Sequence, residues 1–393
     1  MTWAGKGKVA VAGIGFSALT RRSEQHLGKL AFDAANAALV DAGLEASQVD
    51  GLATYIMGGT GRDGVDSVSA DYFLKHYTLS PDFRWYAELQ QGMIASAVIE
   101  GVNAIISGMA NYVLVWRAMH NPPDRPYTQV TARTAQGDSQ FSLPYGQSAV
   151  YQWHAMAYQR YLHEYGAKRE SMAALAVNSR RNANMNERAY FRDTPMSEED
   201  YLNSRFIAEP LCLFDCDIPI EGCAAFVLTS AERARDLKNP PAFIASVAQN
   251  TARNRPAMIS YILDDYMACG ATLAGQLWGD SGLGPRDMGA AQLYDGFSPS
   301  TYYWLEAAGF CDKGEAHAFV QNGRIAIEGE MPVNTFGGSL SEGRLHGMGH
   351  LAEAALQVTG RAGPRQVADC NASCAIDGSP LLRGSGVVFT SEP

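Results

Sequence analysis

Two stretches of this chain lie 239 residues apart and follow one pattern, which constrains the fold more than any other feature of the sequence. Residues 41–55 and 280–294 both begin with Asp-x-Gly-Leu, pass through a short polar loop, and end in an apolar run that closes on a tyrosine, Tyr55 or Tyr294. A glycine in this place stops a helix, and the apolar run is typical of a buried strand. The constant offset predicts two copies of one α/β unit.

The boundary between the two copies is predicted near residue 239. Asn239-Pro240-Pro241 is a turn signal that separates two short apolar runs. The first unit is therefore expected at residues 1–238 and the second at 239–393. Residues from about 117 to 205 have no counterpart in the second unit and are interpreted as an inserted loop and helical cap. A duplicated unit of this kind is expected to place its active site where equivalent strand ends meet across a pseudo-twofold axis.

Two loops of the second unit carry unusual residues and are predicted to face one pocket. Tyr294-Asp295-Gly296-Phe297-Ser298 follows an apolar run, so it lies at a strand end, where layered α/β folds usually bind ligands. The later stretch 334–347 is rich in glycine and contains Arg344 and His346. From residue type alone, Asp295 is equally consistent with capping a helix, Arg344 with a surface ion pair, and His346 with a structural role.

Composition excludes several classes of function. The net charge is −10 and no basic run is longer than Arg180-Arg181, so neither nucleic acid nor an anionic membrane surface is an expected partner. No apolar run is long enough for a membrane span, and the first residues lack a signal-peptide pattern. The seven cysteines are irregularly spaced. We therefore expect a cytoplasmic protein with reduced thiols.

Two further patterns raise the question of a cofactor or a metal, and neither is favoured. Gly13-x-Gly15-x-x-Ala18 resembles half of a dinucleotide fingerprint, but polar residues intervene before the next helix. A tight turn after a core strand is the preferred interpretation. Cys212, Cys216 and Cys223 match no zinc spacing and adjoin apolar runs, which predicts buried thiols. We expect neither a metal nor a bound cofactor.

Three C-terminal motifs together carry a resemblance to a known family. They are Tyr294-Asp295-Gly296-Phe297-Ser298, then Gly309-Phe310-Cys311-x-Lys313-Gly314-Glu315-Ala316, then Pro332-Val333-Asn334-Thr335-x-Gly337-Gly338. With these motifs the chain resembles, essentially end to end, the sterol-carrier-protein-type branch of the thiolase superfamily, and within it the steroid side-chain aldolases. The resemblance implies a five-layered αβαβα fold with two similar halves, an acyl-CoA ligand and a homodimer. It also implies a small partner protein with an OB fold and a zinc ribbon, in a hetero-oligomer.

The chain departs from ordinary thiolases at their catalytic positions. Thiolases have a nucleophilic cysteine where the helix after Gln90-Gln91-Gly92 begins, but residues 1–211 contain no cysteine. The catalytic Gly-His-Pro motif is represented by Gly343-Arg344, and the sequence around Cys370 and Cys374 does not reproduce the Cys-x-Gly turn. Covalent acyl transfer through a thiolate is therefore not expected.

Loss of the nucleophile agrees with what the aldolase branch implies. Retro-aldol cleavage needs a base for the β-hydroxyl proton and a stabiliser for the thioester enolate, but no acyl-enzyme. That branch uses two tyrosines: one matches Tyr294, and the other falls at Arg344, which stays protonated and cannot be an ordinary base. Gly296 stands where the branch typically has a histidine. The predicted catalytic residues are Tyr294, Asp295, Arg344 and His346, and the predicted substrate-binding residues are Gln91, Phe336, Gly337 and Gly338.

The sequence therefore predicts a lyase that cleaves a β-hydroxyacyl-CoA with a bulky, steroid-like side chain, with Tyr294 in proton transfer. Two alternatives stay open. Arg344 and Gly296 are also consistent with a subunit that binds acyl-CoA without turnover, or that needs its partner for activity. The other alternative is an acyltransferase in which Cys370 or Cys374 acts as nucleophile or base.

Overall fold

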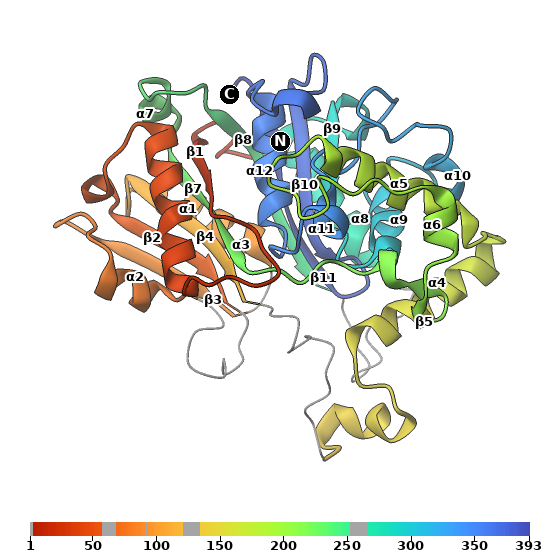
Figure 1. Ribbon diagram of the computed structural model, residues 1–393. Helices are drawn as coiled ribbons and strands as arrows, with labels where there is room; N and C mark the ends of the chain where they lie inside the picture. The colour runs from red at the N-terminus through yellow and green to blue at the C-terminus, as the bar shows by residue number, and fades with distance from the viewer. Residues whose placement is uncertain (1–2, 57–67, 91–92, 121–133, 252–265) are drawn as a thin grey trace.

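The computed structural model describes residues 3–56, 68–90, 93–120, 134–251 and 266–393 (Figure 1). Within these ranges nine strands form one mixed sheet in the order β3-β2-β4-β7-β1-β8-β11-β10-β9. The strands are β1 (Val9–Phe16), β2 (Gly51–Tyr55), β3 (Trp85–Leu89), β4 (Tyr112–Met119), β7 (Gly222–Ser230), β8 (Ala242–Thr251), β9 (Ala290–Leu293), β10 (Ala372–Ser379) and β11 (Arg383–Thr390). A separate small ribbon pairs β5 (Phe206–Ala208) with β6 (Leu211–Cys212).

Strand pairing repeats between the two halves of the large sheet. In the first half β2 is parallel to β4, β4 is antiparallel to β7, and β7 is antiparallel to β1. In the second half β9 is parallel to β10, β10 is antiparallel to β11, and β11 is antiparallel to β8. A short antiparallel contact between β1 and β8 joins the halves. The repeated sequence pattern therefore corresponds to a repeated topology, in which β2 and β9 occupy equivalent positions.

Three hydrophobic clusters divide the structure into five layers. α1 (Leu27–Ala42) packs on the outer face of the first half through alanine and leucine. α3 (Ile94–Ile106) and α12 (Met348–Val358) lie in the middle and share one cluster with strands of both halves (Figure 1). α8 (Tyr266–Ser281) and α9 (Ser298–Ala307) cover the outer face of the second half. The succession of helix, sheet, helix, sheet and helix confirms the predicted αβαβα class.

The helices of the insertion pack against the second half. α4 (Val150–Tyr165) and α5 (Glu170–Asn184) belong to the same hydrophobic cluster as α8 and α9. None of the helices in the described ranges is long and apolar enough to cross a membrane. The remaining short helices are α2 (Ala70–His76), α6 (Glu198–Leu202), α7 (Ala231–Arg235), α10 (Ala316–Phe319) and α11 (Gly338–Ser341).

A side-chain cap sets the start of α1, and the boundary of the insertion differs from the sequence-based expectation. α1 begins at Leu27 because the ring of His26 accepts a hydrogen bond from the Gly28 N–H at 3.1 Å, whereas the Ser23 N–H donates to Glu221. Strand β4 continues to Met119, so residues 117–119 belong to the sheet and not to the insertion. The charged Arg117 ends the apolar run in the sequence, although its side chain is buried in the structure.

The glycine pair that resembles a dinucleotide fingerprint lies inside a strand and not in a turn. Gly13 and Gly15 are residues of β1, which packs against α1. A Cβ atom at either glycine would lie 2.2 Å from a backbone oxygen of α1. The two glycines therefore allow a close approach of helix and strand, which is a packing role.

Candidate active site

The repeated tyrosines stand at equivalent strand ends, each accompanied by a buried charge. Tyr55 is the last residue of β2, and Tyr294 directly follows β9. β2 is paired in parallel with β4, and Arg117 is the residue of β4 that follows the last paired position. β9 is paired in the same way with β10, where Asp377 follows the last paired position. Both are almost completely buried. The duplication thus provides a cation beside one strand end and an acid beside the other.

Arg117 is a buried cation whose hydrogen-bond partners are neutral. Its side chain is 2% exposed. One terminal nitrogen donates to the Tyr55 carbonyl at 2.7 Å, the other lies 3.0 Å from Nδ1 of His346, and the guanidinium lies 5.0 Å from the centre of the Tyr55 ring. Among the described residues no carboxylate pairs with it, although buried charges are normally paired. Burial lowers the pKa of Arg117 to about 10, so the side chain remains cationic at neutral pH.

The contact with Arg117 fixes His346 as a neutral hydrogen-bond donor. Arginine has no acceptor atom, so Nδ1 of His346 must accept the hydrogen bond. Burial, together with the charges of Arg344 and Arg117, lowers the pKa of His346 well below its ordinary value. The neutral ring therefore carries its proton on Nε2. The backbone of His346 has a φ of 49°, a conformation that side chains other than glycine rarely adopt.

Tyr294 is a partly exposed phenol in surroundings that keep it protonated. Its N–H donates to the Ile376 carbonyl at 2.9 Å, which fixes the backbone at the strand end. Burial raises the pKa of Tyr294 well above its ordinary value, the negative charge of Asp217 adds to the rise, and Arg344 opposes it. A Cβ atom at Gly296 would lie only 3.0 Å from the Tyr294 hydroxyl oxygen. A side chain at position 296 would therefore displace this phenol.

Arg344 belongs to this site because it pairs with a buried acid and not with a surface residue. Its Nε lies 3.6 Å from Oδ2 of Asp217, and the two residues are 7% and 5% exposed. The Arg344 N–H also donates to the Ile218 carbonyl at 3.0 Å. The charge of Arg344 acts on the pKa of both Tyr294 and Tyr55. The two strand ends and the loop around residue 344 therefore share one electrostatic environment.

Asp295 holds the two predicted loops together. Its buried carboxylate accepts a hydrogen bond from the Ser339 N–H at 2.7 Å and lies 3.0 Å from Nε2 of His350. The His350 ring in turn lies 5.6 Å from the Tyr294 ring. These contacts give Asp295 a structural role beside Tyr294, and its direct action on a substrate stays a prediction.

The predicted substrate-binding residues of the second loop are buried against other parts of the protein. Gly337 and Gly338 have φ values of 103° and 64°, which favour glycine. A Cβ atom at Gly337 would lie 2.6 Å from Ala183, and one at Gly338 would lie 1.9 Å from the Asp295 carboxylate. The Phe336 ring packs 4.9 Å from the His350 ring. Their contact with substrate stays a prediction, and Gln91 lies outside the described residues.

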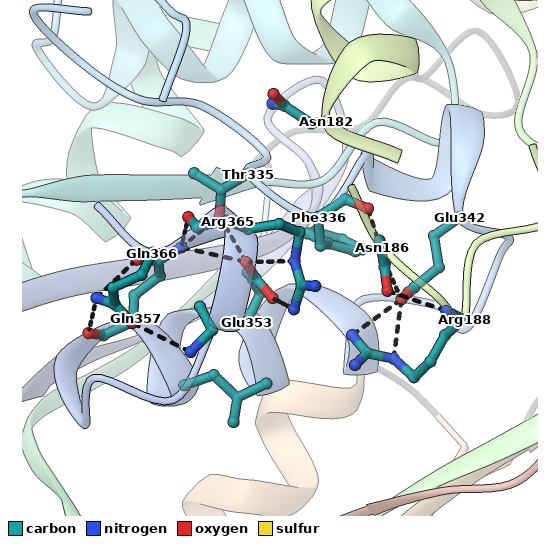
Figure 2. Close-up of polar contacts among 12 residues, drawn as sticks. Asn182, Asn186, Arg188, Thr335, Phe336, Glu342, Glu353, Gln357, Arg365 and Gln366 are labelled. Atoms are coloured by element: carbon teal, nitrogen blue, oxygen red, sulfur yellow. Dashed lines mark hydrogen bonds and ion pairs between the residues drawn. The ribbon is translucent and has the colours of Figure 1, made fainter. Parts of the chain in front are cut away.

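Side chains of the insertion fasten this loop from one side (Figure 2). The Asn186 amide donates to the Phe336 carbonyl at 2.9 Å and to Glu342 at 2.8 Å. Arg188 pairs with the same carboxylate of Glu342 at 3.2 Å. The Asn182 amide donates to the Asn334 carbonyl at 3.1 Å. The loop of the second unit therefore depends on residues that follow or end α5.

A buried ion pair fastens the loop from the other side (Figure 2). The Thr335 hydroxyl donates to Glu353 of α12 at 2.8 Å. Arg365 holds the same carboxylate with two contacts at 3.0 and 3.1 Å, and Gln357 contacts it at 3.2 Å. Breaking one partner of such a pair costs about 3–5 kcal/mol, because a buried charge is left uncompensated. Buried contacts thus hold the loop from both sides.

The N-terminus of α3, where the resemblance places the thiolase cysteine, meets an acid from the other half. α3 begins at Ile94, and the Ala95 N–H donates to Asp377 at 2.9 Å. The Ser385 hydroxyl donates to the same carboxylate. Burial raises the pKa of Asp377 to about 7. The N-terminus of α3, which would activate a thiolate, therefore donates a hydrogen bond to a carboxylate of β10.

Comparisons with known proteins agree with this geometry. Residues 262–389 match the family described as thiolase C-terminal domain-like. The chain is 37% identical over 365 residues to the 17-hydroxy-3-oxo-4-pregnene-20-carboxyl-CoA lyase of Mycobacterium tuberculosis, covering 90% of this chain and 92% of that protein. It is also 37% identical over 364 residues to the steroid side-chain-cleaving aldolase of Thermomonospora curvata, covering 90% and 91%.

This chain belongs to the steroid side-chain-cleaving aldolase family of the thiolase superfamily. A solved structure titled Ltp2-ChsH2(DUF35) aldolase superposes with a TM-score of 0.87 at 35% identity, covering 98% of each chain. The similarity extends over both halves, so the predicted family and fold are confirmed. The names of these relatives describe carbon–carbon lyases.

The cysteines of this aldolase-family chain are all free thiols. Cys212 and Cys223 are buried as predicted, and Cys216 is partly buried. Burial raises the pKa of Cys370 and of Cys374 to about 12, so the reactive thiolate is scarce at neutral pH. No cluster of potential metal ligands occurs within the described ranges.

Four residues around the two strand ends carry no functional assignment from the sequence. The sequence pattern indicates Tyr55 only as the repeat partner of Tyr294, and it indicates no role for Arg117, Asp217 or Asp377. A signal existed for Arg117, since a charge directly after the apolar run 112–116 is unusual for a buried strand. The two acids carried no such signal, because their partners lie far away in the sequence.

Proposed function

We propose that this protein is a lyase that cleaves a β-hydroxyacyl-CoA with a bulky, steroid-like side chain, and that Tyr294 takes part in proton transfer. The observation that carries the proposal is a partly exposed phenol at a strand end, under the influence of the cations Arg344 and Arg117, in a chain of this aldolase family. The M. tuberculosis relative is named as a lyase of a 17-hydroxy steroid with a carboxyl-CoA group at carbon 20. In such a compound the hydroxyl group lies β to the thioester carbonyl, which is the arrangement that a retro-aldol reaction cleaves.

Retro-aldol cleavage consists of two proton transfers around one carbon–carbon bond. A base removes the β-hydroxyl proton, the Cα–Cβ bond breaks with its electrons moving into a thioester enolate, and an acid protonates Cα. The products are a ketone and a shortened acyl-CoA. Burial and the charge of Asp217 keep Tyr294 protonated, so its phenol is suited to the acid step.

The enolate requires preorganised positive charge and hydrogen-bond donors. Arg344 and Arg117 supply permanent positive charge, and His346 carries its proton on the nitrogen that faces away from Arg117. We assign these three side chains to stabilisation of the enolate. The reaction in this form uses the coenzyme A thioester as substrate and needs neither an acyl-enzyme, a metal nor a bound cofactor.

The two edges of the sheet support an assembly with a second copy of this chain. Edge strand β9 is covered, since the Ala291 N–H donates to the Pro332 carbonyl at 2.9 Å and the Asn334 N–H donates to the Ala291 carbonyl at 3.1 Å. Edge strand β3 pairs only with β2 among the described residues, and its Tyr86 is 59% exposed. An open edge strand is suited to pairing across a twofold axis. Light scattering of the purified chain measures whether it forms the proposed homodimer.

A partner protein is also part of the proposal. The structure titled Ltp2-ChsH2(DUF35) aldolase names a second component beside a chain that resembles this one over 98% of its length. We therefore propose that this chain acts in a hetero-oligomer with a small OB-fold and zinc-ribbon protein. Activity is accordingly measured with and without such a partner.

The decisive experiment is a lyase assay with a tertiary β-hydroxyacyl-CoA of steroid type. We expect a ketone and a shortened acyl-CoA from the wild type, and a roughly 10²–10⁴-fold lower kcat from Tyr294→Phe, because one proton-transfer group is lost. Tyr77→Phe is the control, since it removes a hydroxyl group that bonds Asn36 on the outer face of the first half. Wild-type turnover by Tyr294→Phe would exclude the assigned role.

A subunit that binds acyl-CoA without turnover is the second candidate. The observation in its favour is Arg344, which stands where the aldolase branch has a tyrosine. Titration with an acyl-CoA that lacks the β-hydroxyl group measures binding separately from cleavage. Binding without cleavage, both alone and with the partner, would favour this candidate over the lyase. The acyltransferase alternative is disfavoured by the buried thiols of Cys370 and Cys374, and unchanged activity after their replacement by serine would remove it.

A further inference from the structure

We propose that Tyr55 is the second phenol of the reaction and removes the β-hydroxyl proton of the substrate. Arg117 is the residue that positions Tyr55 and stabilises its phenolate. This inference rests on the proposed function and assigns its missing base. Tyr55 occupies in the first half the strand-end position that Tyr294 occupies in the second half. A pseudo-twofold duplication therefore supplies two phenols to one site.

Neither phenol uses its hydroxyl group for a hydrogen bond with the described part of the protein. Neither hydroxyl oxygen, of Tyr55 or of Tyr294, is one of the fully buried side-chain atoms that have no hydrogen-bond partner. Tyr55 as a whole is 6% exposed. By contrast, the buried hydroxyls of Tyr161 and Tyr266 both donate to Glu306. Tyr55 thus differs from tyrosines whose hydroxyl groups serve the fold.

Arg117 gives Tyr55 an electrostatic partner that a purely structural tyrosine would not need. The guanidinium bonds the Tyr55 carbonyl and lies over its ring, and no described carboxylate neutralises it. An unpaired buried cation is costly, and an anion nearby reduces that cost. A phenolate on Tyr55 supplies this anion within the same residue pair. The cation therefore reduces the cost of ionising Tyr55, although burial still leaves the pKa of this phenol above its ordinary value.

The groups that face Tyr55 come from four elements and are mostly cationic. They are Arg117 on β4, Arg383 on β11, Asp377 on β10, and Arg344 with neutral His346 on the loop before α12. Burial raises the pKa of Tyr55, the three arginines oppose that rise, and Asp377 adds to it.

Tyr294 instead has two acids, Asp217 and Asp295, among its charged neighbours, beside the cations Arg344 and Arg117. The acids favour its protonated form, whereas the arginines around Tyr55 favour a phenolate. Tyr55 is accordingly assigned as the base and Tyr294 as the acid.

The complete step conserves protons and electrons. The Tyr55 phenolate takes the proton from the β-hydroxyl group, whose oxygen forms a carbonyl double bond as the Cα–Cβ bond breaks. The electron pair of that bond enters the thioester as an enolate, which takes the proton of the Tyr294 hydroxyl at Cα. Transfer of one proton from Tyr55 to Tyr294 restores the starting enzyme. The products are the ketone and the shortened acyl-CoA.

Hydrogen exchange in the product separates the two phenols. In D₂O without the ketone, the shortened acyl-CoA exchanges its Cα hydrogen through the enolate, which requires Tyr294 but not the base for the β-hydroxyl proton. We expect Tyr55→Phe to lose cleavage by roughly 10²–10⁴-fold and to lose less of the exchange, because solvent can take the Tyr294 proton when Tyr55 is absent. We expect Tyr294→Phe to lose both activities, and Tyr77→Phe to retain both. Mass spectrometry measures the exchange, and kinetics of ketone release measure the cleavage.

Each outcome decides between the two proposals. Cleavage by the wild type together with equal cleavage by Tyr55→Phe overturns the role of Tyr55 and leaves the lyase intact. If Tyr55→Phe loses as much exchange as cleavage, Tyr55 acts in folding or binding, and its role as base is overturned. Failure of the wild type to cleave with its partner present overturns the lyase and, with it, this inference. Replacing Tyr55 with a fluorinated tyrosine of lower pKa is expected to shift the acidic limb of the kcat–pH profile toward lower pH, which a structural role would not do.

Discussion

The two halves of this protein share one topology but place opposite charges beside the equivalent strand ends. In the first half, Tyr55 lies beside Arg117, and this cation has neutral hydrogen-bond partners. In the second half, Tyr294 has Asp217 and Asp295 among its charged neighbours, and Asp377 stands at the position equivalent to Arg117. Burial raises the pKa of both phenols, but three arginines oppose the rise at Tyr55, whereas two acids add to it at Tyr294. A duplicated fold thus gives its two phenols different environments, which is what acid–base chemistry requires.

The difference also extends to how each strand end is supported. The Arg117 contacts reach His346 of the second half, whereas Asp377 reaches back to the Ala95 N–H at the start of α3. Each charged residue therefore binds an element of the opposite half. The site depends on both copies at once, and neither half contains a complete set of the assigned groups.

Removing the positive charge of Arg117 is expected to lower activity strongly. It tests directly whether the different charges beside Tyr55 and Tyr294 matter for the reaction. Arg117→Met eliminates the charge that favours the Tyr55 phenolate, so the pKa of Tyr55 rises and the base form requires a higher pH. We expect kcat at neutral pH to fall by roughly 10- to 1000-fold, since one nearby charge shifts a pKa by about one to three units. The acidic limb of the kcat–pH profile should move toward higher pH. Arg361→Met, which removes a more exposed ion pair with Asp41, is the control.

If kcat falls in Arg117→Met but the acidic limb of the kcat–pH profile does not shift, the electrostatic role of Arg117 is contradicted. It would show that Arg117 supports the fold or contacts the substrate without acting on the phenol. The comparison of the full pH profiles, and not of one rate, therefore decides the question.

Neutralising the acid of the second half is expected to change how stability depends on pH. The pKa of Asp377 is raised to about 7 in the folded protein, above its ordinary value of 3.8, so the folded protein binds more protons than the unfolded chain between these pH values. This contribution makes the wild type lose stability as the pH rises from about 4 to about 7, by at most about 1.4 kcal/mol per pH unit. Asp377→Asn should remove that slope while lowering stability overall, because Asn cannot accept all the hydrogen bonds of Asp377. Urea unfolding at several pH values measures it, and identical slopes in both proteins would contradict the prediction.

The smallest expected effect concerns the loop that supports Tyr294. Gly338 and Gly360 both have positive φ, 64° and 68°, so alanine is strained at either position. A Cβ atom at Gly338 would overlap the Asp295 carboxylate, whereas no atom lies within 4 Å of one at Gly360. We expect Gly338→Ala to destabilise the protein by about 1–3 kcal/mol more than Gly360→Ala, because only the former overpacks a buried contact. Equal unfolding free energies would mean that the loop around Asp295 relaxes freely.

The duplication and the position of Tyr294 could be predicted because their signals are local. A glycine stop, a polar loop and an apolar run ending in tyrosine are read within fifteen residues, and they occur twice. Strand β10 was not predicted, since residues 372–379 are mostly small or polar and show no alternation. Strand β3 was missed for a similar reason, as its run is short and lies at an edge.

The charges around the two phenols could not be predicted, because the contacts that define them are remote in sequence. Arg117 is 62 residues from its partner Tyr55 and 229 residues from His346. A pattern within one segment carries no information about such pairs. Only the folded arrangement distinguishes a buried cation in a reaction site from a charge at the start of a surface loop.

The contacts of Asn182, Asn186 and Arg188 with the loop at 334–342 also have a consequence for protein engineering. These three residues belong to the segment that only the first unit possesses, yet they hold a loop of the second unit. The segment and the loop must therefore be exchanged together in any engineered variant, although some 150 residues separate them. A chimera between two aldolases of this family would keep a working scaffold only if both pieces came from the same parent.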